Sequence, residues 1–164
     1  MTLRWSPRAS ALGTTSSEDP RPEDLGLHAA PRPHPAPRTL KLTIAYDGTS
    51  YVGWQRQENG LSVQQVIEDA LQPMCGDDVP VVMGAGRTDA GVHASGQVAS
   101  VRVAFDHPAN AVHRALNVRL PADIRVLAVE DAEPRFHARF DATGKSYRYR
   151  IATERVPLPF AGVL

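Results

Sequence analysis

Cysteine, long apolar runs and net charge are scarce or absent in this chain of 164 residues. The one cysteine, Cys75, excludes an internal disulfide and a cysteine-rich zinc site. No apolar stretch approaches the roughly 18 residues that a membrane-spanning helix requires. The 18 basic and 18 acidic residues cancel, which argues against attraction of the whole molecule to nucleic acid. We therefore expect a cytoplasmic protein with no membrane partner, and the length suits one domain plus a tail.

The first 38 residues differ in composition from the rest of the chain. They hold seven of the 14 prolines and end in PRPHPAPR at 31–38. Such a segment buries too little apolar surface to offset its ordering entropy, so we predict a disordered Pro/Arg-rich tail over 1–38. It has neither the continuous apolar core of a secretory signal nor the regular amphipathic pattern of a transit peptide. The folded part is then 39–164.

Hydrophobic periodicity after the tail predicts strands that alternate with helices. The strands fall at 40–46, 79–83, 101–105, 124–129 and 146–151. Ser62 and Gln65 form a capping box, and the helix that they start is expected to end at Pro73. A second helix runs between Pro108 and Pro121, with alanine, valine and leucine on its inner face.

The resulting order is β-α-β-β-α-β plus one further strand. It predicts an α+β fold with a ferredoxin-like antiparallel sheet and helices on one face only. The other face of such a sheet stays free, and related modules use it to bind RNA. On the further strand, Tyr147, Tyr149 and Ile151 would share one face, and two arginines the other.

The stretch GAGRTDAGVHASG at 84–96 packs four glycines around Arg87 and Asp89. It has three ordinary interpretations: a hairpin connection, a loop braced by an ion pair, or a phosphate loop, although an aspartate repels anions and no Lys-Ser/Thr follows. The fourth is an active site. A carboxylate is ionised at neutral pH and can act as a nucleophile without a general base. An arginine nearby can restrain it, and glycines admit a flat substrate. The residues alone leave the hairpin and the active site both open.

Residues 135–155 form a local basic segment in a neutral chain, with six Arg or Lys residues against two acidic ones. Such a run can follow a phosphate backbone, although most charge runs are only solvated surface. We expect His137, Arg139 and Arg148 to contact RNA. Elsewhere we expect structural roles, for residues that anchor or brace loops or fill the core: Trp54, Gln57, Cys75, His93 and Gln97.

The stretch GRTDAGVHASGQV at 86–98 resembles the signature of the tRNA pseudouridine synthases, in particular the family that acts on the anticodon arm. Four further blocks resemble the same family in the same order: YDGTSYVGWQRQ at 46–57, SVQQVIEDAL at 62–71, LNVRLPADIRV at 116–126 and FHARFDATGKSYRYRI at 136–151. The resemblance covers 40–164 almost continuously. It implies the pseudouridine synthase fold, a tRNA-uridine isomerase active on the anticodon stem-loop, a homodimer, and no cofactor or metal.

The resemblance also implies roles for three residues. Asp89 corresponds to the essential aspartate and would be the nucleophile. Arg87 corresponds to the arginine that positions it and holds open the stack that the target base leaves. Tyr147 corresponds to the tyrosine that packs on that base. The reaction breaks the N-glycosidic bond of uridine, rotates the base and rejoins it through C5, with attack on the ring or on the sugar C1′ left open.

The family continues beyond the point that corresponds to Leu164, into a second α/β half. We expect this chain to be a fragment or, as the alternative, a half-protein without catalysis, and to be marginally stable alone because a sheet edge or apolar face would be exposed. The competing functions are a non-catalytic RNA-binding module and, more weakly, a nucleotide-binding α/β domain.

Overall fold

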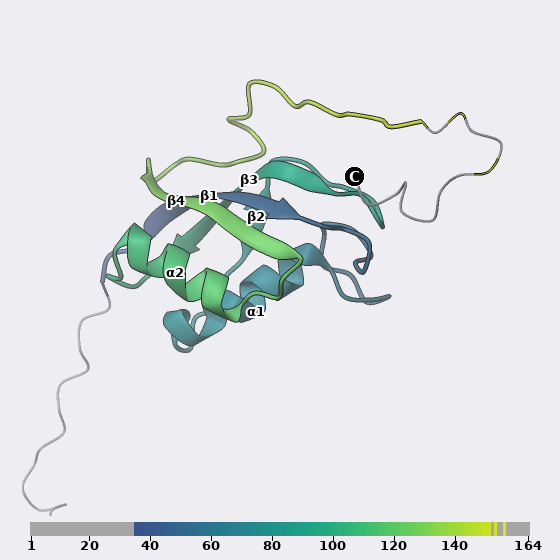
Figure 1. Ribbon diagram of the computed structural model, residues 1–164. Coiled ribbons are helices and arrows are strands. Elements are labelled where there is room, and N and C mark those ends of the chain that lie inside the picture. Colours follow the sequence, from purple (N-terminus) through teal and green to yellow (C-terminus); the bar gives the residue numbers. More distant parts are fainter. Residues whose placement is uncertain (1–34, 152, 154–155, 157–164) are drawn as a thin grey trace, which may run out of the picture. The chain divides into compact units, whose positions relative to one another are not determined.

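The part of the chain that the structure describes forms a four-stranded antiparallel sheet with two helices on one face (Figure 1). The computed structural model describes residues 35–151, 153 and 156. Its elements are β1 (Arg38–Tyr46), α1 (Val63–Cys75), β2 (Val82–Gly84), β3 (Ala94–Val103), α2 (Ala109–Arg119) and β4 (Ile124–Ala132). The strand order is β2-β3-β1-β4. The ferredoxin-like arrangement predicted from the sequence is therefore confirmed, since each helix connects two strands that flank a third.

Strand β1 is the centre of the sheet and of the core. It pairs with β3 on one side and β4 on the other, and its alternation places Leu40, Leu42 and Ile44 wholly out of solvent on the helix side. The helices cover them with side chains that are also fully buried: Ile67 and Leu71 from α1, Val112 and Leu116 from α2.

Helix α1 begins as predicted but ends later. The Ser62 hydroxyl accepts a hydrogen bond from the Gln65 N–H at 3.2 Å and caps the first turn. The prediction that Pro73 ends the helix is wrong, because α1 continues to Cys75. Proline costs the helix one internal hydrogen bond. The Gln72 side chain supports the C-terminal end by donating to the carbonyls of Gly76 and Asp78. Cys75 packs partly buried against the core.

A side chain of helix α2 is hydrogen-bonded to strand β4 next to a shift in the strand's register. The register of β4 against β1 shifts between Thr43 and Ile44, so Leu127 is unpaired and half exposed. Next to it, Asn117 of α2 donates to the Val126 carbonyl at 2.8 Å and accepts from the Val126 N–H at 3.0 Å. Side-chain bonds thus fasten the outer strand to the helix that precedes it.

Several of the predicted strands differ from those in the structure. Strand β3 begins at Ala94, inside the glycine-rich stretch, so the loop proper is only 85–93. Strand β1 begins at Arg38, inside the predicted tail, whose residues 1–34 lie outside the described part. The predicted strand at 146–151 is wrong, since none of these residues is in a strand.

The chain after β4 crosses the sheet face that the helices leave open (Figure 1). The Thr39 hydroxyl donates to the Pro134 carbonyl at 3.1 Å, and the Ala138 N–H donates to the Ser100 hydroxyl at 3.1 Å. Ala138 is 2% exposed as a result. The expectation of a free open face is therefore wrong over this stretch of β1 and β3, where the chain itself covers the sheet.

Candidate active site

The glycine-rich loop 85–93 joins the paired strands β2 and β3 and is fixed at both ends. The Ala85 N–H donates to the Val98 carbonyl at 2.7 Å, and the Gln97 amide donates to the Gly86 carbonyl at 2.6 Å. The predicted role of Gln97 as a loop brace is thereby confirmed. The register of β3 against β1 is irregular where the loop ends, between the pairs that involve Ile44 and Tyr46. Such an irregularity bends a strand and re-aims its side chains.

The centre of the loop rests on the segment that follows β1. The Trp54 N–H donates to the Thr88 carbonyl at 3.0 Å. Gly53 lies so close to the loop that a Cβ there would meet Thr88 O at 2.5 Å and the Asp89 carbonyl carbon at 3.1 Å. A Cβ at Gly48 would overlap the Val92 carbonyl. Backbone therefore contacts backbone along this seam, and glycine is required because no side chain fits.

Aromatic side chains complete the support from below. The Tyr46 hydroxyl and the Thr88 hydroxyl are hydrogen-bonded at 2.8 Å. Trp54 is 2% exposed, and a Cβ at Gly84 would meet its indole ring at 2.5 Å. The ring centroids of Tyr46 and Trp54 are 6.0 Å apart. Trp54 is thus confirmed as an anchor of its loop, and it anchors the neighbouring loop as well.

A polar pair closes the far end of the loop. His93 Nδ1 lies 3.0 Å from Asp47 Oδ1 and 3.3 Å from the Gly48 N–H, so protonated Nδ1 donates to the carboxylate and unprotonated Nδ1 accepts from Gly48. Hydrogen bonds from the Thr49 hydroxyl and N–H, with a smaller contribution from His93, lower the pKa of Asp47. The predicted structural role of His93 is confirmed.

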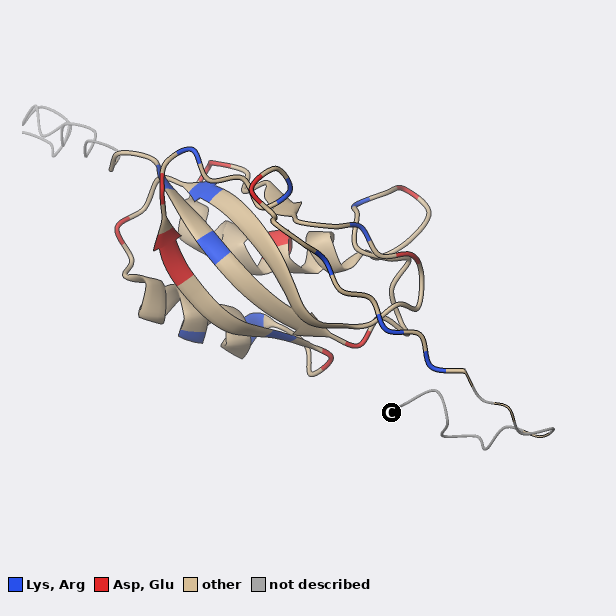
Figure 2. Cartoon of the chain, turned by 90° about the horizontal axis from the view of Figure 1, so that it is seen from above, with Lys and Arg blue, Asp and Glu red and all other residues tan. Residues whose placement is uncertain are grey.

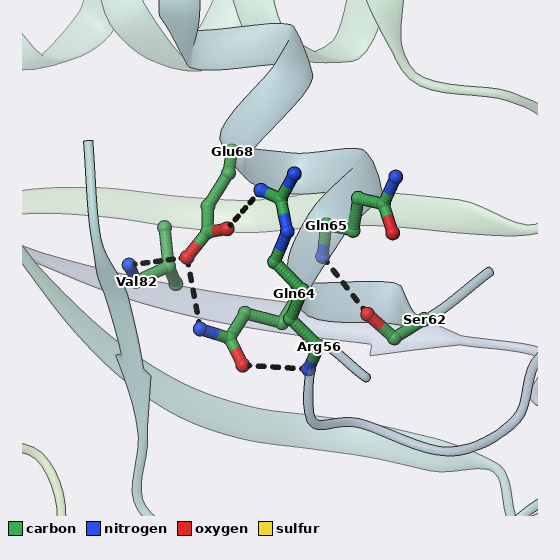
Figure 3. A network of polar contacts seen from close by, with 6 residues as sticks. All are labelled: Arg56, Ser62, Gln64, Gln65, Glu68 and Val82. Carbon is green, nitrogen blue, oxygen red and sulfur yellow. Dashed lines mark hydrogen bonds and ion pairs between the residues drawn. The ribbon is translucent and has the colours of Figure 1, made fainter. Parts of the chain in front are cut away.

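A buried carboxylate holds the 49–60 loop that supports this site (Figure 3). Glu68 of α1 is 5% exposed and accepts from Arg56 Nη1 at 3.0 Å, from the Gln64 amide at 2.8 Å and from the Val82 N–H at 3.0 Å. Gln64 in turn accepts from the Arg56 N–H. The Gln57 amide braces the same loop through the Val52 carbonyl, as predicted. One side chain thus links the loop, α1 and the start of β2.

Arg87 and Asp89 are both exposed at the surface of the braced loop. In the described part of the chain, no ion pair or side-chain hydrogen bond involves either of them. The expected restraint of Asp89 by the Arg87 guanidinium is therefore absent from this conformation. The backbone contacts of the residue between them, Thr88, hold the aspartate instead. The main chain of Asp89 is therefore fixed, whereas its carboxylate faces solvent and has no protein partner in the described residues.

Tyr147 lies beside the loop although it is not on a strand. A Cβ at Gly86 would meet the Tyr147 hydroxyl at 3.3 Å and Lys145 Cδ at 3.6 Å. Tyr147 is 61% exposed, whereas Tyr149 is 88% exposed. The structure thus brings Tyr147 and a lysine to the same end of the loop as Arg87, and leaves Tyr149 outside.

Basic residues follow the extended segment after β4 (Figure 2). Arg139 and Arg148 are exposed, whereas His137 is half-buried and structural in part. Its ring lies 4.3 Å from that of Phe140, and Nδ1 accepts from the Arg139 N–H at 3.2 Å. Arg155, the last basic residue of the segment, lies outside the described residues.

Sequence reasoning missed Tyr46, Thr88 and Gly53 as parts of the site. In the sequence, Tyr46 stands out only as the last residue of the strand predicted at 40–46. Thr88 is only the residue between Arg87 and Asp89. The available signal was polar: a tyrosine that ends a buried strand needs a partner for its hydroxyl. Within the described residues, no cluster of His, Cys, Asp or Glu could hold a metal ion. No helix there is long and apolar enough to cross a membrane.

The fold and the loop together define a ferredoxin-like domain that displays an exposed carboxylate on a braced, glycine-rich loop beside a tyrosine. The tRNA pseudouridine synthase family model matches residues 42–141. The chain belongs to this family.

Curated relatives agree with the match. The chain is 51% identical over 120 residues to tRNA pseudouridine synthase A of Paramagnetospirillum magneticum. The aligned residues are 72% of this chain and 46% of that protein. It is 52% identical over 121 residues to tRNA pseudouridine synthase A of Beijerinckia indica, with 73% and 46% covered. The match to the protein of that name from Brucella ovis is 53% identical over 121 residues, with 72% and 48% covered. The chain spans about half the length of the curated relatives it matches.

Proposed function

We propose that this chain supplies the catalytic loop of a tRNA pseudouridine synthase, an isomerase that converts uridine to pseudouridine in the anticodon stem-loop, with Asp89 as the nucleophile. The observation that carries the proposal is the exposed Asp89 side chain on a loop whose main chain is fixed on both sides of it. A nucleophile must be held at the reacting atom, and fixed backbone supplies that orientation without neutralising the charge.

The surroundings of Asp89 suit a flat base that has left its stack. Flipping a base out of the stack costs a few kcal/mol. Tyr147, 61% exposed and next to Gly86, offers a ring on which the base can stack, which offsets roughly 1–3 kcal/mol of that cost. Gly86, which has no side chain, lets the Tyr147 hydroxyl and Lys145 lie close to the loop backbone on this side. Arg87 is free of protein partners in the described residues and can occupy the gap that the base leaves.

The basic segment provides the grip on RNA. Lys145 lies beside Gly86 of the loop, and Arg148 and Arg150 follow it along the extended segment after β4, on which Figure 2 colours the basic residues blue. Exposed arginines and lysines bind phosphates and set the register of a strand without reading its sequence. Recognition of the anticodon arm would then depend on its shape.

The test is Asp89→Asn in the complete protein that carries this chain, with tRNA labelled with tritium at uridine C5. We expect release of the label to fall by roughly a thousandfold or more, with tRNA affinity retained. Asp77→Asn, which changes another exposed aspartate in the turn after α1, is the matched control and should release label at the parental rate. Unchanged release by Asp89→Asn would refute the role of the aspartate.

Two further variants test the base platform. Tyr147→Ala should lower the rate, and Tyr149→Ala should leave it unchanged, because only Tyr147 reaches the loop. Equal effects of both would contradict the assignment. If the wild-type protein bound tRNA in a salt-dependent manner but converted no uridine, the rival function, a non-catalytic RNA-binding module, would hold instead.

A further inference from the structure

Thr88 is the residue between Arg87 and Asp89, and each of its polar side-chain and carbonyl groups has a partner. Its hydroxyl is bonded to the Tyr46 hydroxyl at 2.8 Å, and its carbonyl accepts from the Trp54 N–H at 3.0 Å. Thr88 is therefore held by the Tyr46 hydroxyl at its side chain and by the Trp54 N–H at the carbonyl of its peptide bond to Asp89. The orientation of this peptide unit decides where the Asp89 side chain points.

Gly53 restricts the same peptide unit from a second direction. Its position places Thr88 O, the Asp89 carbonyl carbon and the Ala90 nitrogen within 2.5, 3.1 and 3.4 Å of where its Cβ would be. The main chain on this side has no space to move inward. The hydrogen bond to the Tyr46 hydroxyl fixes the Thr88 side chain from the other direction.

Tyr46 is itself rigid, and this makes it suitable as a fixed reference. It is 4% exposed, ends the central strand and pairs with Ala94 on one side and Ile124 on the other. Burial raises the pKa of Tyr46, so its hydroxyl keeps its proton throughout the neutral range. The side chains of Gln97 and Tyr147 also lie close to this hydroxyl.

We propose that the Tyr46 hydroxyl, acting through Thr88, is a positioning group that aims the Asp89 carboxylate at the substrate. This inference rests on the proposed function and adds to it a residue that never touches the reacting atoms. Without the hydroxyl the carboxylate keeps its charge and its access to solvent, but the loop samples orientations that do not react. A misplacement of about 1 Å can cost a factor of roughly 100 in rate.

The experiment compares Tyr46→Phe, Thr88→Val and Thr88→Ser in the complete protein. Tyr46→Phe and Thr88→Val should each lower kcat by about 10- to 100-fold and leave KM for tRNA little changed, because neither variant alters the basic residues proposed to bind the RNA phosphates. Thr88→Ser keeps the hydroxyl and should keep most of the rate. The double variant Tyr46→Phe/Thr88→Val should be no slower than either single variant, since both remove one interaction.

Tyr51→Phe is the matched control. Tyr51 is also a buried tyrosine; its main-chain carbonyl accepts from the Gly91 N–H of the loop, but its hydroxyl, the only group that the substitution removes, donates to Asp123 Oδ1 at 2.8 Å and not to the loop. This variant should lose stability to a similar extent and retain kcat. If Tyr46→Phe retained kcat within about twofold, or lost it only in step with Tyr51→Phe, the positioning role would be overturned.

Hydrogen exchange separates this inference from the proposed function. In Tyr46→Phe, the Trp54 amide and the peptide 85–93 should exchange roughly three- to tenfold faster, whereas the amides of β1 should not. Unchanged exchange would overturn the inference even in an active enzyme. If the wild-type protein converted no uridine, the proposed function and the catalytic part of this inference would both fail. Exchange would then still report whether Tyr46 holds the loop.

Discussion

Gly53→Ala should be the most damaging small substitution near the loop. Gly53 has φ +112°, a conformation that side chains rarely adopt, which costs about 1–3 kcal/mol for alanine. The new methyl group would also meet Thr88 O at 2.5 Å, and moving backbone out of the way costs about 1–3 kcal/mol more. We expect a loss of roughly 2–6 kcal/mol in the free energy of unfolding, a large part of the stability of a domain of this size.

Three other glycines separate the two contributions. Gly91 has φ +77° and open space around it, so Gly91→Ala should show strain alone, about 1 kcal/mol. Gly48 has no positive φ but lies against the Val92 carbonyl, so Gly48→Ala should show overlap alone. Gly96 has neither, and Gly96→Ala should be within about 0.5 kcal/mol of the parent.

Urea unfolding followed by circular dichroism measures all four variants, provided that the slope with denaturant stays constant across them. The turnover of tRNA by Gly53→Ala should fall more than its folded fraction does, because the overlap displaces the carbonyls beside Asp89. If Gly53→Ala were no less stable than Gly91→Ala, the close contact between residue 53 and the loop would not exist in solution. The bracing of Asp89 by this segment would then be refuted.

Three further predictions concern the support of the site. Glu68→Ala should cost about 2–4 kcal/mol in urea unfolding because it leaves the Val82 N–H and two side chains without a partner, and it should cost more than Arg56→Ala, which leaves Glu68 two donors. Ser62→Ala should cost about 1 kcal/mol by the same measurement, and no loss would contradict the helix cap. An alkaline titration followed by tyrosinate absorbance tests the burial of Tyr46 and Tyr51. Burial raises the pKa of both, and burial together with the hydrogen bond to Asp123 raises the pKa of Tyr51 to about 12, so we expect both to ionise late in the titration. Their contribution to stability is complete below the ordinary tyrosine pKa near 10 and should be lost as the pH rises through the raised values, whereas a single absorbance step near pH 10 would contradict their burial.

Most of the helices and strands could be predicted because they depend on interactions between residues that are close in the sequence. The Ser62–Gln65 spacing located the start of α1, since the cap bond joins residues three apart. Alternation located β1 and β4, which bury one face. Strand β3 was placed too late, because A-S-G-Q-V at 94–98 has no apolar alternation, although its backbone pairs with β1.

The failed strand at 146–151 shows the limit of alternation. A period of two tells which side chains share a face, but a strand also requires a neighbouring backbone with free N–H and C=O groups. In the described residues no strand pairs with 146–151, and Tyr149 and Ile151 are left exposed. Tyr147 reaches the loop all the same.

The sequence singled out the candidate residues of the loop but not the residues that support them. Arg87 and Asp89 stand out by type and spacing, and their presence on one exposed loop was foreseeable. Spacing did not reveal that Thr88, and not Arg87, carries the restraint. The Tyr46–Thr88 bond spans 42 residues and joins a strand end to a loop, which no local pattern reports.

The position of β1 in the sheet has a consequence for the order of folding. Both partners of β1 come later in the chain, β3 at Ala94–Val103 and β4 at Ile124–Ala132. A single strand is not stable alone, and an isolated helix of 13 residues is marginal in water. During synthesis the first half of the domain therefore stays without lasting structure until β3 has left the ribosome. The sheet then closes over long sequence separations, which slows folding relative to a domain built on local contacts.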